Sequence, residues 1–386
     1  MEAKPKSLGT SAMAIALAFP KGMDMSCELC PRRARLQCTK CRVTFYCDAE
    51  HQQADWVGIH GRICQLLVPI RTRTLPSVKQ ADHNEIQLKR AELIEICRVV
   101  AQSKLSERKH HEALLAAQFC LRSSIEVHGS NAAQTIDAYR LLADANMGLG
   151  NLTLVVELLS QAERAVLKNP ECGHGVHHRL HRSLGRFYTT TGNLEAALFN
   201  FANDIYFASE EYGLYSTVTS GGYFLMADVF AKQGKMPIAR SLYSDVAGVW
   251  HSYLTKLLQT HIQYLQKPDM RVEPSYDRAQ RVEVDEILRT MLEFEQNYPR
   301  KDPAQVALVA NCLAMLWFLG GDSLKALGFG STAQQASQLI PNHNLAKHIQ
   351  GLLQLVQSLQ TEPRTCPAHL SALGDLLHQD ICLAPR

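Results

Sequence analysis

The sequence predicts a mainly α-helical fold in which a small N-terminal module precedes a long array of paired helices. Six of the twelve cysteines lie between residues 27 and 64, together with two histidines at regular spacing. Beyond residue 90 strand signals are few, and small residues recur every 42 positions. A fixed period of this length is the sequence signature of a helical repeat array. These observations divide the chain into a cysteine-rich module and a repeat region.

The composition limits the classes of protein to which the chain can belong. With 386 residues, 46% of them hydrophobic and 20% charged, the chain is too long for one simple core and has an ordinary soluble composition. A net charge of +3 gives little support for a nucleic-acid partner. No apolar run approaches the ~20 residues of a membrane helix, so no membrane partner is expected. The other six cysteines are scattered, which is typical of a reducing compartment such as the cytoplasm.

The cysteines and histidines of residues 27–64 form four pairs with the spacing of metal ligands, C-x2-C-x7-C-x2-C-x5-C-x3-H-x8-H-x3-C. A CxxC pair on a tight turn points both sulfurs at one ion, and residues four apart share a helix face. Buried free cysteines and stray histidines cannot explain four such pairs in succession. Structural zinc takes four Cys or His ligands, so eight ligands predict two zinc ions. The ligands are Cys27, Cys30, Cys38, Cys41, Cys47, His51, His60 and Cys64.

This spacing, with FYC ending at Cys47 and QADW following His51, resembles the MYND-type zinc finger. The resemblance implies interleaved sites, in which the first and third pairs bind one zinc and the second and fourth pairs bind the other. The family usually has cysteine where this chain has His51, and histidine is an equally good zinc ligand. With every position filled by the protein, the two zinc ions are expected to be structural.

The same resemblance implies a role in protein interaction, because several MYND fingers bind short proline-rich peptides in a groove beside the helix. The groove residues of the family map onto Gln52 and Trp56, which are four apart and therefore face the same way. An exposed indole beside an amide suits a proline ring and a peptide carbonyl. The alternative is that Trp56 packs under the finger as its only large apolar residue, and the sequence leaves both open.

The repeat region shows small residues at two recurring positions. The first set is Ala101, Ala143, Gly185 and Ala227; seven residues later, from the second repeat on, come Gly150, Gly192 and Gly234. Small residues let two antiparallel helices approach closely, and the glycines mark where the first helix ends. The pattern, best in YTTTGNLEAALFNF, resembles the tetratricopeptide repeat, whose unit of about 34 residues is eight shorter. The predicted organisation is a tail at 1–26, a finger at 27–64, a linker at 65–90, repeats at 91–265, a loop or break at 266–280, degenerate repeats with a capping helix at 281–360, and a tail at 361–386.

A basic stripe is predicted on the third repeat. Arg179, Arg182 and Arg186 fall at i, i+3 and i+7 of its first helix. Helical solenoids leave a concave surface lined by the first helix of each pair, and the tetratricopeptide register would place the stripe there. Acidic peptides are therefore candidate ligands, alongside proline-rich peptides for the finger. The alternative is a solvated stripe with no partner.

Two further motifs are candidate sites of chemistry. CGHGVHHRLH, from Cys172 to His181, has histidines four apart but lacks a second CxxC-like pair, so we expect its histidines to cap helices or lie on the surface. PNHNL, from Pro341, resembles the NH-x-C motif of SET lysine methyltransferases that carry MYND fingers. No cysteine follows Asn342-His343 at the required place, and no glycine-rich stretch near the N-terminus could hold a methyl donor. The protein is therefore predicted not to be an enzyme, and a relative of the methyltransferases is the disfavoured alternative.

The whole-chain combination resembles a family of MYND-finger proteins with tetratricopeptide repeats that belongs to motile cilia and the sperm flagellum. The runs CRVTFYCDAEHQQADW, FANDIYFAS and TSGGYF carry this resemblance. It implies a partner that is another axonemal tetratricopeptide protein, together with dynein-associated components. The residues by themselves predict only a non-enzymatic protein-protein interaction adaptor. A nuclear corepressor adaptor that uses the same finger is the alternative among binding modules.

Overall fold

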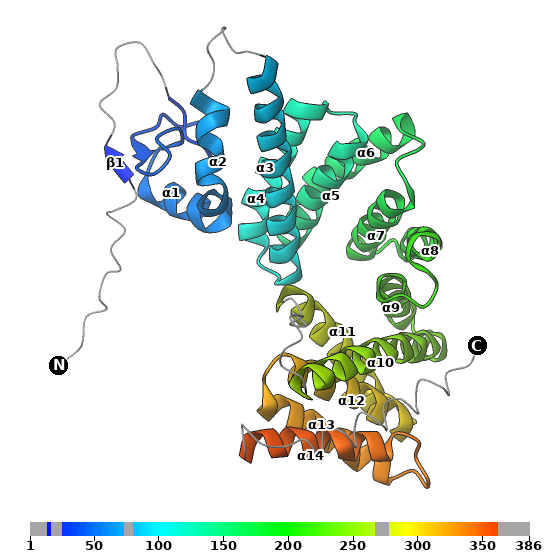
Figure 1. Cartoon of the computed structure of the whole chain (residues 1–386). Helices are drawn as coiled ribbons and strands as arrows, with labels where there is room; N and C mark the ends of the chain where they lie inside the picture. Colours follow the sequence, from blue (N-terminus) through cyan, green and yellow to red (C-terminus); the bar gives the residue numbers. More distant parts are fainter. Residues whose placement is uncertain (1–13, 17–24, 73–79, 267–277, 362–386) are drawn as a thin grey trace, which may run out of the picture. The chain divides into compact units, whose positions relative to one another are not determined.

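The computed structural model describes residues 14–16, 25–72, 80–266 and 278–361, nearly all of which lie in or between α-helices (Figure 1). The mainly α fold with an N-terminal metal-binding finger is confirmed. The chain forms two compact units, residues 1–172 and 173–386. None of the helices in the described ranges is long and apolar enough to span a membrane.

The finger combines short strands with one nearly continuous helical segment. Strands β2 (Leu36–Cys38) and β3 (Phe45–Tyr46) pair antiparallel, with Leu36 opposite Tyr46, and β1 (Ala14–Ala16) pairs with the other edge of β2. Helix α1 (Ala49–Asp55) begins at Asp48, whose carboxylate accepts a hydrogen bond from the backbone N–H of His51 at 2.8 Å. It continues through the π-helical turn η2 (Trp56–His60) into α2 (Gly61–Thr72).

The remaining helices of the first unit follow as antiparallel neighbours, each packed against the next in sequence. They are α3 (Gln80–Ser106), α4 (His110–His128), α5 (Ala133–Gly148) and α6 (Leu152–Lys168). The predicted linker at 65–90 needs correction, because α2 extends to Thr72 and α3 begins at Gln80. The reason is that Ile63 and Leu67, four apart on α2, are fully buried and give this segment an apolar face that packs inward.

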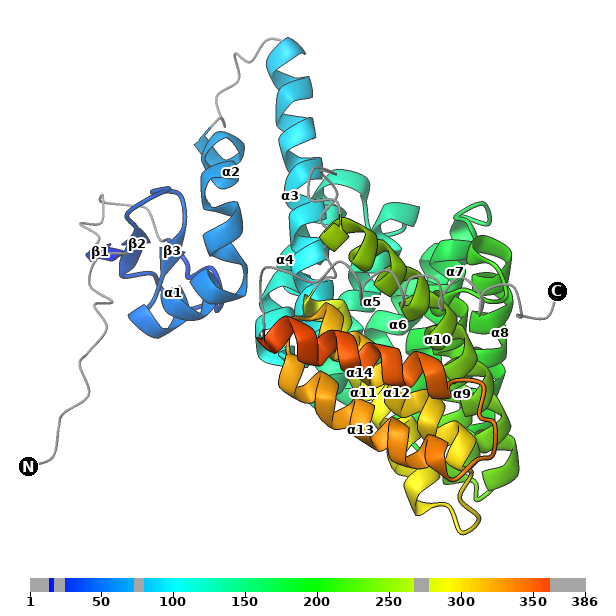
Figure 2. The same ribbon diagram turned by 60° about the horizontal axis from the view of Figure 1, so that its bottom comes forward.

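The second unit contains eight helices within the described residues, and Figure 2 shows them from a second direction. They are α7 (His174–Thr190), α8 (Leu194–Tyr212), α9 (Thr217–Lys232), α10 (Met236–Gln266), α11 (Arg278–Asn297), α12 (Pro303–Leu319), α13 (Ser323–Gln338) and α14 (Ala346–Thr361). Helix α10, with 31 residues, packs against both α9 and α12, and α11 packs against α12. The break predicted at 266–280 falls mostly outside the described residues.

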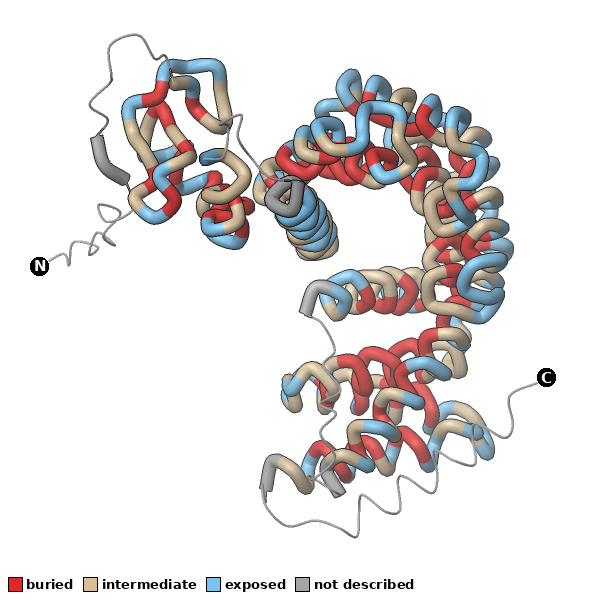
Figure 3. The backbone as a smooth tube through the Cα atoms, turned by 45° about the horizontal axis from the view of Figure 1, so that its top comes forward, coloured by how far each residue is buried: buried red, intermediate tan, exposed pale blue. Residues whose placement is uncertain are grey.

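The recurring small residues have the packing role that the sequence suggested. A Cβ atom added to Gly185 on α7 would lie 2.4 Å from a ring carbon of Phe201 on α8, so only glycine allows these two helices to come so close. Gly192 ends the same hairpin's first helix with φ of +81°, which glycine adopts without strain. Figure 3 shows buried residues on the facing sides of paired helices and exposed residues on their outer sides.

Candidate metal centre

The first metal site gathers Cys27, Cys30, Cys47 and His51. Their ligand atoms all lie within 4.8 Å of one another. The imidazole Nδ1 of His51 is 3.1 Å from the Cys47 sulfur and 3.5 Å from the Cys27 sulfur, and the sulfurs of Cys30 and Cys47 are 3.6 Å apart. Ligand atoms ~2.0–2.3 Å from a tetrahedral zinc ion lie about 3.3–3.8 Å from one another, so this arrangement fits zinc.

The second site gathers Cys38, Cys41, His60 and Cys64, and all four residues are buried. The sulfurs of Cys38 and Cys64 are 3.9 Å apart, and Nε2 of His60 is 3.6 Å from the Cys41 sulfur. The two tetrads therefore interleave along the chain as predicted, and together they fit two zinc ions. Each set supplies four protein ligands, which is the pattern of a structural zinc site.

The electrostatics of the second site favour a bound cation. Burial would raise the pKa of the Cys41 thiol, but its hydrogen bonds with His60 and Thr44 lower the pKa to about 6. Burial raises the pKa of Cys64 to about 12, and the charges of Cys41 and Cys38 add to the rise. One sulfur thus opposes deprotonation of its neighbour. A divalent ion between them removes this repulsion and allows both sulfurs to bind as thiolates.

The carboxylate of Asp55 supports His60, and the sequence did not predict this role. Asp55, at the end of α1, is buried and accepts a hydrogen bond from the Tyr46 hydroxyl at 2.7 Å. Its carboxylate oxygen lies 3.8 Å from Nδ1 of His60, the ring nitrogen that faces away from Cys41. A carboxylate on the far side of a metal-binding imidazole fixes its tautomer and orientation. The spacing of Asp55 and His60 across a π-helical turn gave no recognisable signal.

Glu28 anchors the finger to the helices that follow it. It lies between the first two ligands, and its carboxylate accepts hydrogen bonds from both terminal nitrogens of Arg71 on α2, at 2.8 and 3.0 Å. It also pairs with Arg122 on α4. Both guanidinium groups lie over the ring of Phe119 on α4, at 5.8 and 4.7 Å from its centroid. Burial opposes ionisation of Glu28, but the two arginines hold its pKa below the usual value.

Close backbone packing supports the same contact between finger and repeat region. A Cβ atom added to Gly58 in η2 would lie 2.8 Å from a methyl carbon of Leu115 on α4, so Leu115 would have to shift to admit a larger residue here. Helix α2 packs against α3, and η2 packs against α4. The finger and the first helical hairpin therefore share one interface within the first unit.

The two residues predicted to line a peptide groove differ in their surroundings. Gln52 is only 5% exposed, which does not fit the predicted contact with a peptide, because its side chain lies on the buried face of α1. Trp56 is half-buried and packs against the cysteine cluster. Its ring lies beneath the Lys40 ammonium at 4.5 Å and 5.8 Å from the His60 ring. The packing role of Trp56 thus has direct support, and its use in peptide binding stays a prediction.

The predicted basic stripe also needs correction at Arg182. Its Nε donates to Asp204 on α8 at 2.7 Å, and a terminal nitrogen donates to the Val218 carbonyl at 2.7 Å. The Asp204 side chain is fully buried and needs a charged partner, so Arg182 is held inside the helix packing. Arg179 is half-buried, and of the three only Arg186 is exposed. Of the three arginines of the predicted stripe, Arg186 is the one that remains available to an acidic partner.

The histidine-rich segment surrounds an aromatic ring. The rings of His174, His177 and His181 lie 5.8, 4.7 and 5.6 Å from the ring of Phe207 on α8. His178 points elsewhere, with Nδ1 3.2 Å from Asp204. Among the described residues, the two finger tetrads are the groups of three or more Cys, His, Asp or Glu that could hold a metal. The segment is therefore part of the α7–α8 packing.

We expect two zinc ions per chain in the purified protein. Structural zinc contributes about 10–16 kcal/mol of folding free energy in finger peptides, so a strong chelator should unfold residues 27–64. Hydrogen exchange should then rise across the finger, while α12 in the second unit keeps its protection. Elemental analysis of the untreated protein measures the zinc content, and a value of one or zero would contradict the two-site arrangement.

Replacing Glu28 by Gln should weaken the contact between the finger and α4 without removing zinc. We expect a loss of roughly 2–3 kcal/mol, less than for a fully buried pair because both arginines keep some solvent access. Since the folded-state pKa of Glu28 is lowered, its contribution is complete above the unfolded-state value near 4.5 and is lost as pH falls through the folded pKa. The exposed Glu50, changed to Gln, is the control. Urea unfolding at pH 7 giving equal stability for both variants would contradict the anchor.

Replacing Arg182 by Met should destabilise the second unit by about 3 kcal/mol, because Asp204 would keep a buried charge without its main partner. The exposed Arg186, changed to Met, should stay within ~0.5 kcal/mol of the wild type. Chemical denaturation followed by circular dichroism measures both. If the two variants are equally stable, Arg182 is not the residue that compensates Asp204.

Comparison with known proteins agrees with the geometry of the finger. The family model described as "MYND finger" matches residues 27–64, which contain both tetrads, so this segment is a MYND zinc finger as predicted. Among solved structures, the crystal structure of the apo form of RapI is similar to 75% of this chain over 98% of its own length, with 11% identity and a TM-score of 0.36. The crystal structure of BtubC (BKLC) from P. vanneervenii is similar to 64% of this chain over 94% of its own, with 16% identity and a TM-score of 0.29. Residues 27–64 are thus a MYND finger joined to a helical array.

Proposed function

We propose that this protein is a non-enzymatic adaptor that brings protein partners together in an axonemal complex of motile cilia and sperm flagella. The observation that carries the proposal is a metal-held MYND finger packed against a helical array in the same chain. MYND fingers act in protein interaction, and helical arrays present extended surfaces that suit peptides or partner helices. The closed tetrads support the non-enzymatic part, because a zinc ion held by four protein ligands keeps no position for a substrate.

The ciliary part of the proposal rests on resemblance. The runs CRVTFYCDAEHQQADW, FANDIYFAS and TSGGYF are similar to those of zinc finger MYND domain-containing protein 12, which belongs to motile cilia and the sperm flagellum. That protein works with another tetratricopeptide protein on the axoneme. By the same resemblance, the partners of this chain are an axonemal tetratricopeptide protein and dynein-associated components.

Arg186 is the residue of the predicted stripe that supports an acidic partner. It is exposed on α7, and no ion pair is formed by its side chain among the described residues. An exposed guanidinium can bind a carboxylate through two parallel hydrogen bonds, which lysine cannot reproduce. The interaction would be screened by salt, because it lies at the surface.

We expect the tagged full-length chain, expressed in ciliated cells, to locate to the axoneme and to capture an axonemal tetratricopeptide protein. Arg186→Glu should lower capture severalfold at low salt, and Arg186→Lys should lower it less. Arg164→Glu, a charge reversal at an exposed position of α6, is the matched control. Nuclear localisation with chromatin-associated partners would favour the corepressor alternative, and micromolar binding of S-adenosylmethionine in calorimetry would overturn the non-enzymatic assignment.

A further inference from the structure

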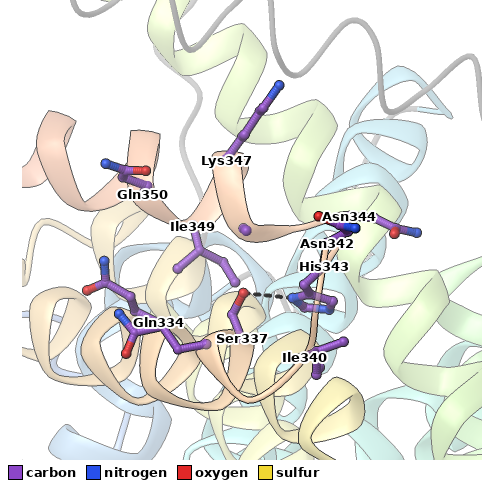
Figure 4. Close-up of a pocket in the computed structure, with 11 residues that line it drawn as sticks. Gln334, Ser337, Ile340, Asn342, His343, Asn344, Lys347, Ile349 and Gln350 are labelled. Atoms are coloured by element: carbon purple, nitrogen blue, oxygen red, sulfur yellow. Dashed lines mark hydrogen bonds between the residues drawn. The ribbon is translucent and has the colours of Figure 1, made fainter.

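A cleft of about 610 Å³ lies between the end of α13 and the start of α14 (Figure 4). Its volume is within the range of ligand-binding sites in proteins. The cleft belongs entirely to the second unit and is separate from both zinc sites. It is lined by Gln334, Ser337, Gln338, Ile340, Asn342, His343, Asn344, Ala346, Lys347, Ile349 and Gln350.

The turn that forms one wall of the cleft is held in place internally. Asn342 has φ of +53°, which reverses the chain after α13. Ser337 Oγ and His343 Nδ1 are hydrogen-bonded at 2.8 Å, as Figure 4 shows. Burial lowers the pKa of His343, which favours its neutral imidazole. Ile349 of α14 is buried and points toward Ser337, which gives the cleft an apolar floor.

Carboxamides are the most frequent side chains in the lining. Five of the eleven residues are Asn or Gln, and no side-chain hydrogen bond of these five is formed among the described residues. Four of these five are exposed and Gln334 is half-buried, so their amide groups face solvent and are available to a ligand, whereas the buried carboxamides of Asn146 and Asn200 donate to backbone carbonyls of their own helices at 2.8 and 2.9 Å. A carboxamide offers both donors and an acceptor. The five are Gln334, Gln338, Asn342, Asn344 and Gln350.

Such a lining matches the hydrogen-bonding needs of an extended peptide. Each residue of an extended chain presents one N–H donor and one C=O acceptor that must be paired when they leave water. Carboxamides pair with both, whereas charged side chains pair with only one kind. Gln334 on α13 and Gln350 on α14 lie on opposite helices, so a strand between them could contact both.

The charge of the lining selects among peptides. Lys347 is the one side chain with a permanent charge among the eleven, and the lining contains no Asp or Glu. It is exposed, and no ion pair involving it is formed among the described residues. The first turn of α14, where Lys347 lies, also carries the positive end of the helix dipole. Both effects favour an acidic ligand over a neutral or basic one.

We propose that the cleft between α13 and α14 binds an extended acidic peptide segment of a partner protein. The carboxamides pair with the peptide backbone, Ile349 and Ile340 contact an apolar side chain, and Lys347 binds a carboxylate. This inference rests on the proposed adaptor function and gives it a second, specific binding site that is distinct from Arg186 and from the finger.

Random octapeptides displayed on phage are selected for binding to the full-length, zinc-loaded protein. Binding of the enriched peptides is then compared between this protein and the double variant Gln334→Glu/Gln350→Glu. These substitutions keep the side-chain shape while removing amide donors and adding negative charge. Gln335→Glu, next to the cleft on α13 but outside its lining, is the matched control. Fluorescence anisotropy then measures the affinity of the enriched peptides. Circular dichroism checks that each variant is folded.

We expect the enriched peptides to be rich in Asp and Glu, to bind at least tenfold more weakly to the double variant, and to bind the Gln335→Glu protein unchanged. Lys347→Gln should weaken binding several-fold and reduce its dependence on salt, whereas Lys256→Gln at an exposed position of α10 should not. Failure to enrich acidic peptides, or equal binding by the double variant, would overturn the proposal. If the cleft binds acidic peptides but the full-length chain captures no axonemal partner, the result counts against the adaptor function and not against the cleft.

Discussion

Tetrahedral coordination by eight Cys and His side chains is the constraint on which the N-terminal part of the structure depends. Strand β2, the CxxC turns and the α1–α2 segment are short and bury few apolar side chains apart from the cysteines. A module of this size cannot fold on its apolar contacts alone, so the metal ligands supply the missing stabilisation. Interleaving ties the first turn to α1 and the second to α2, and neither half of the finger can shift without opening a site.

The same coordination controls how the finger meets the rest of the first unit. Glu28 is placed by the flanking ligands Cys27 and Cys30, and from there it holds Arg71 and Arg122 together. Like charges brought this close would repel without the carboxylate between them. Because Arg122 belongs to α4, ordering of the zinc turn and docking of the first hairpin are linked. Zinc loss should therefore be felt beyond the finger itself, in the protection of α4.

The zinc ligands and the helical array could be predicted because their signals are local. Ligand spacing is read directly from the sequence, and Gly192 or Gly185 report a turn or a close approach at their own positions. The role of Arg182 could not be predicted in this way, because its partner Asp204 lies 22 residues away on another helix. One residue in the sequence is related to the burial of Asp204. Gly222 leaves room for the Asp204 carboxylate, because a Cβ atom at position 222 would lie 3.0 Å from it. Burial of Gln52 likewise depends on how α1 sits over the finger, which periodicity over seven residues does not fix.

The distribution of satisfied polar groups gives the most direct indication of where partners bind. Arg182, Glu28 and Asp55 look like surface charges in the sequence, yet each is used to hold helices or ligands in place. A charged group committed to a buried partner is a poor binding residue, because a ligand would have to replace an interaction that the fold requires. Groups without such commitments, at Arg186 and around the α13–α14 cleft, can bind a partner at no cost to the fold. For an adaptor built from packed helices, this distinction separates the residues that maintain the scaffold from those that are available for recognition.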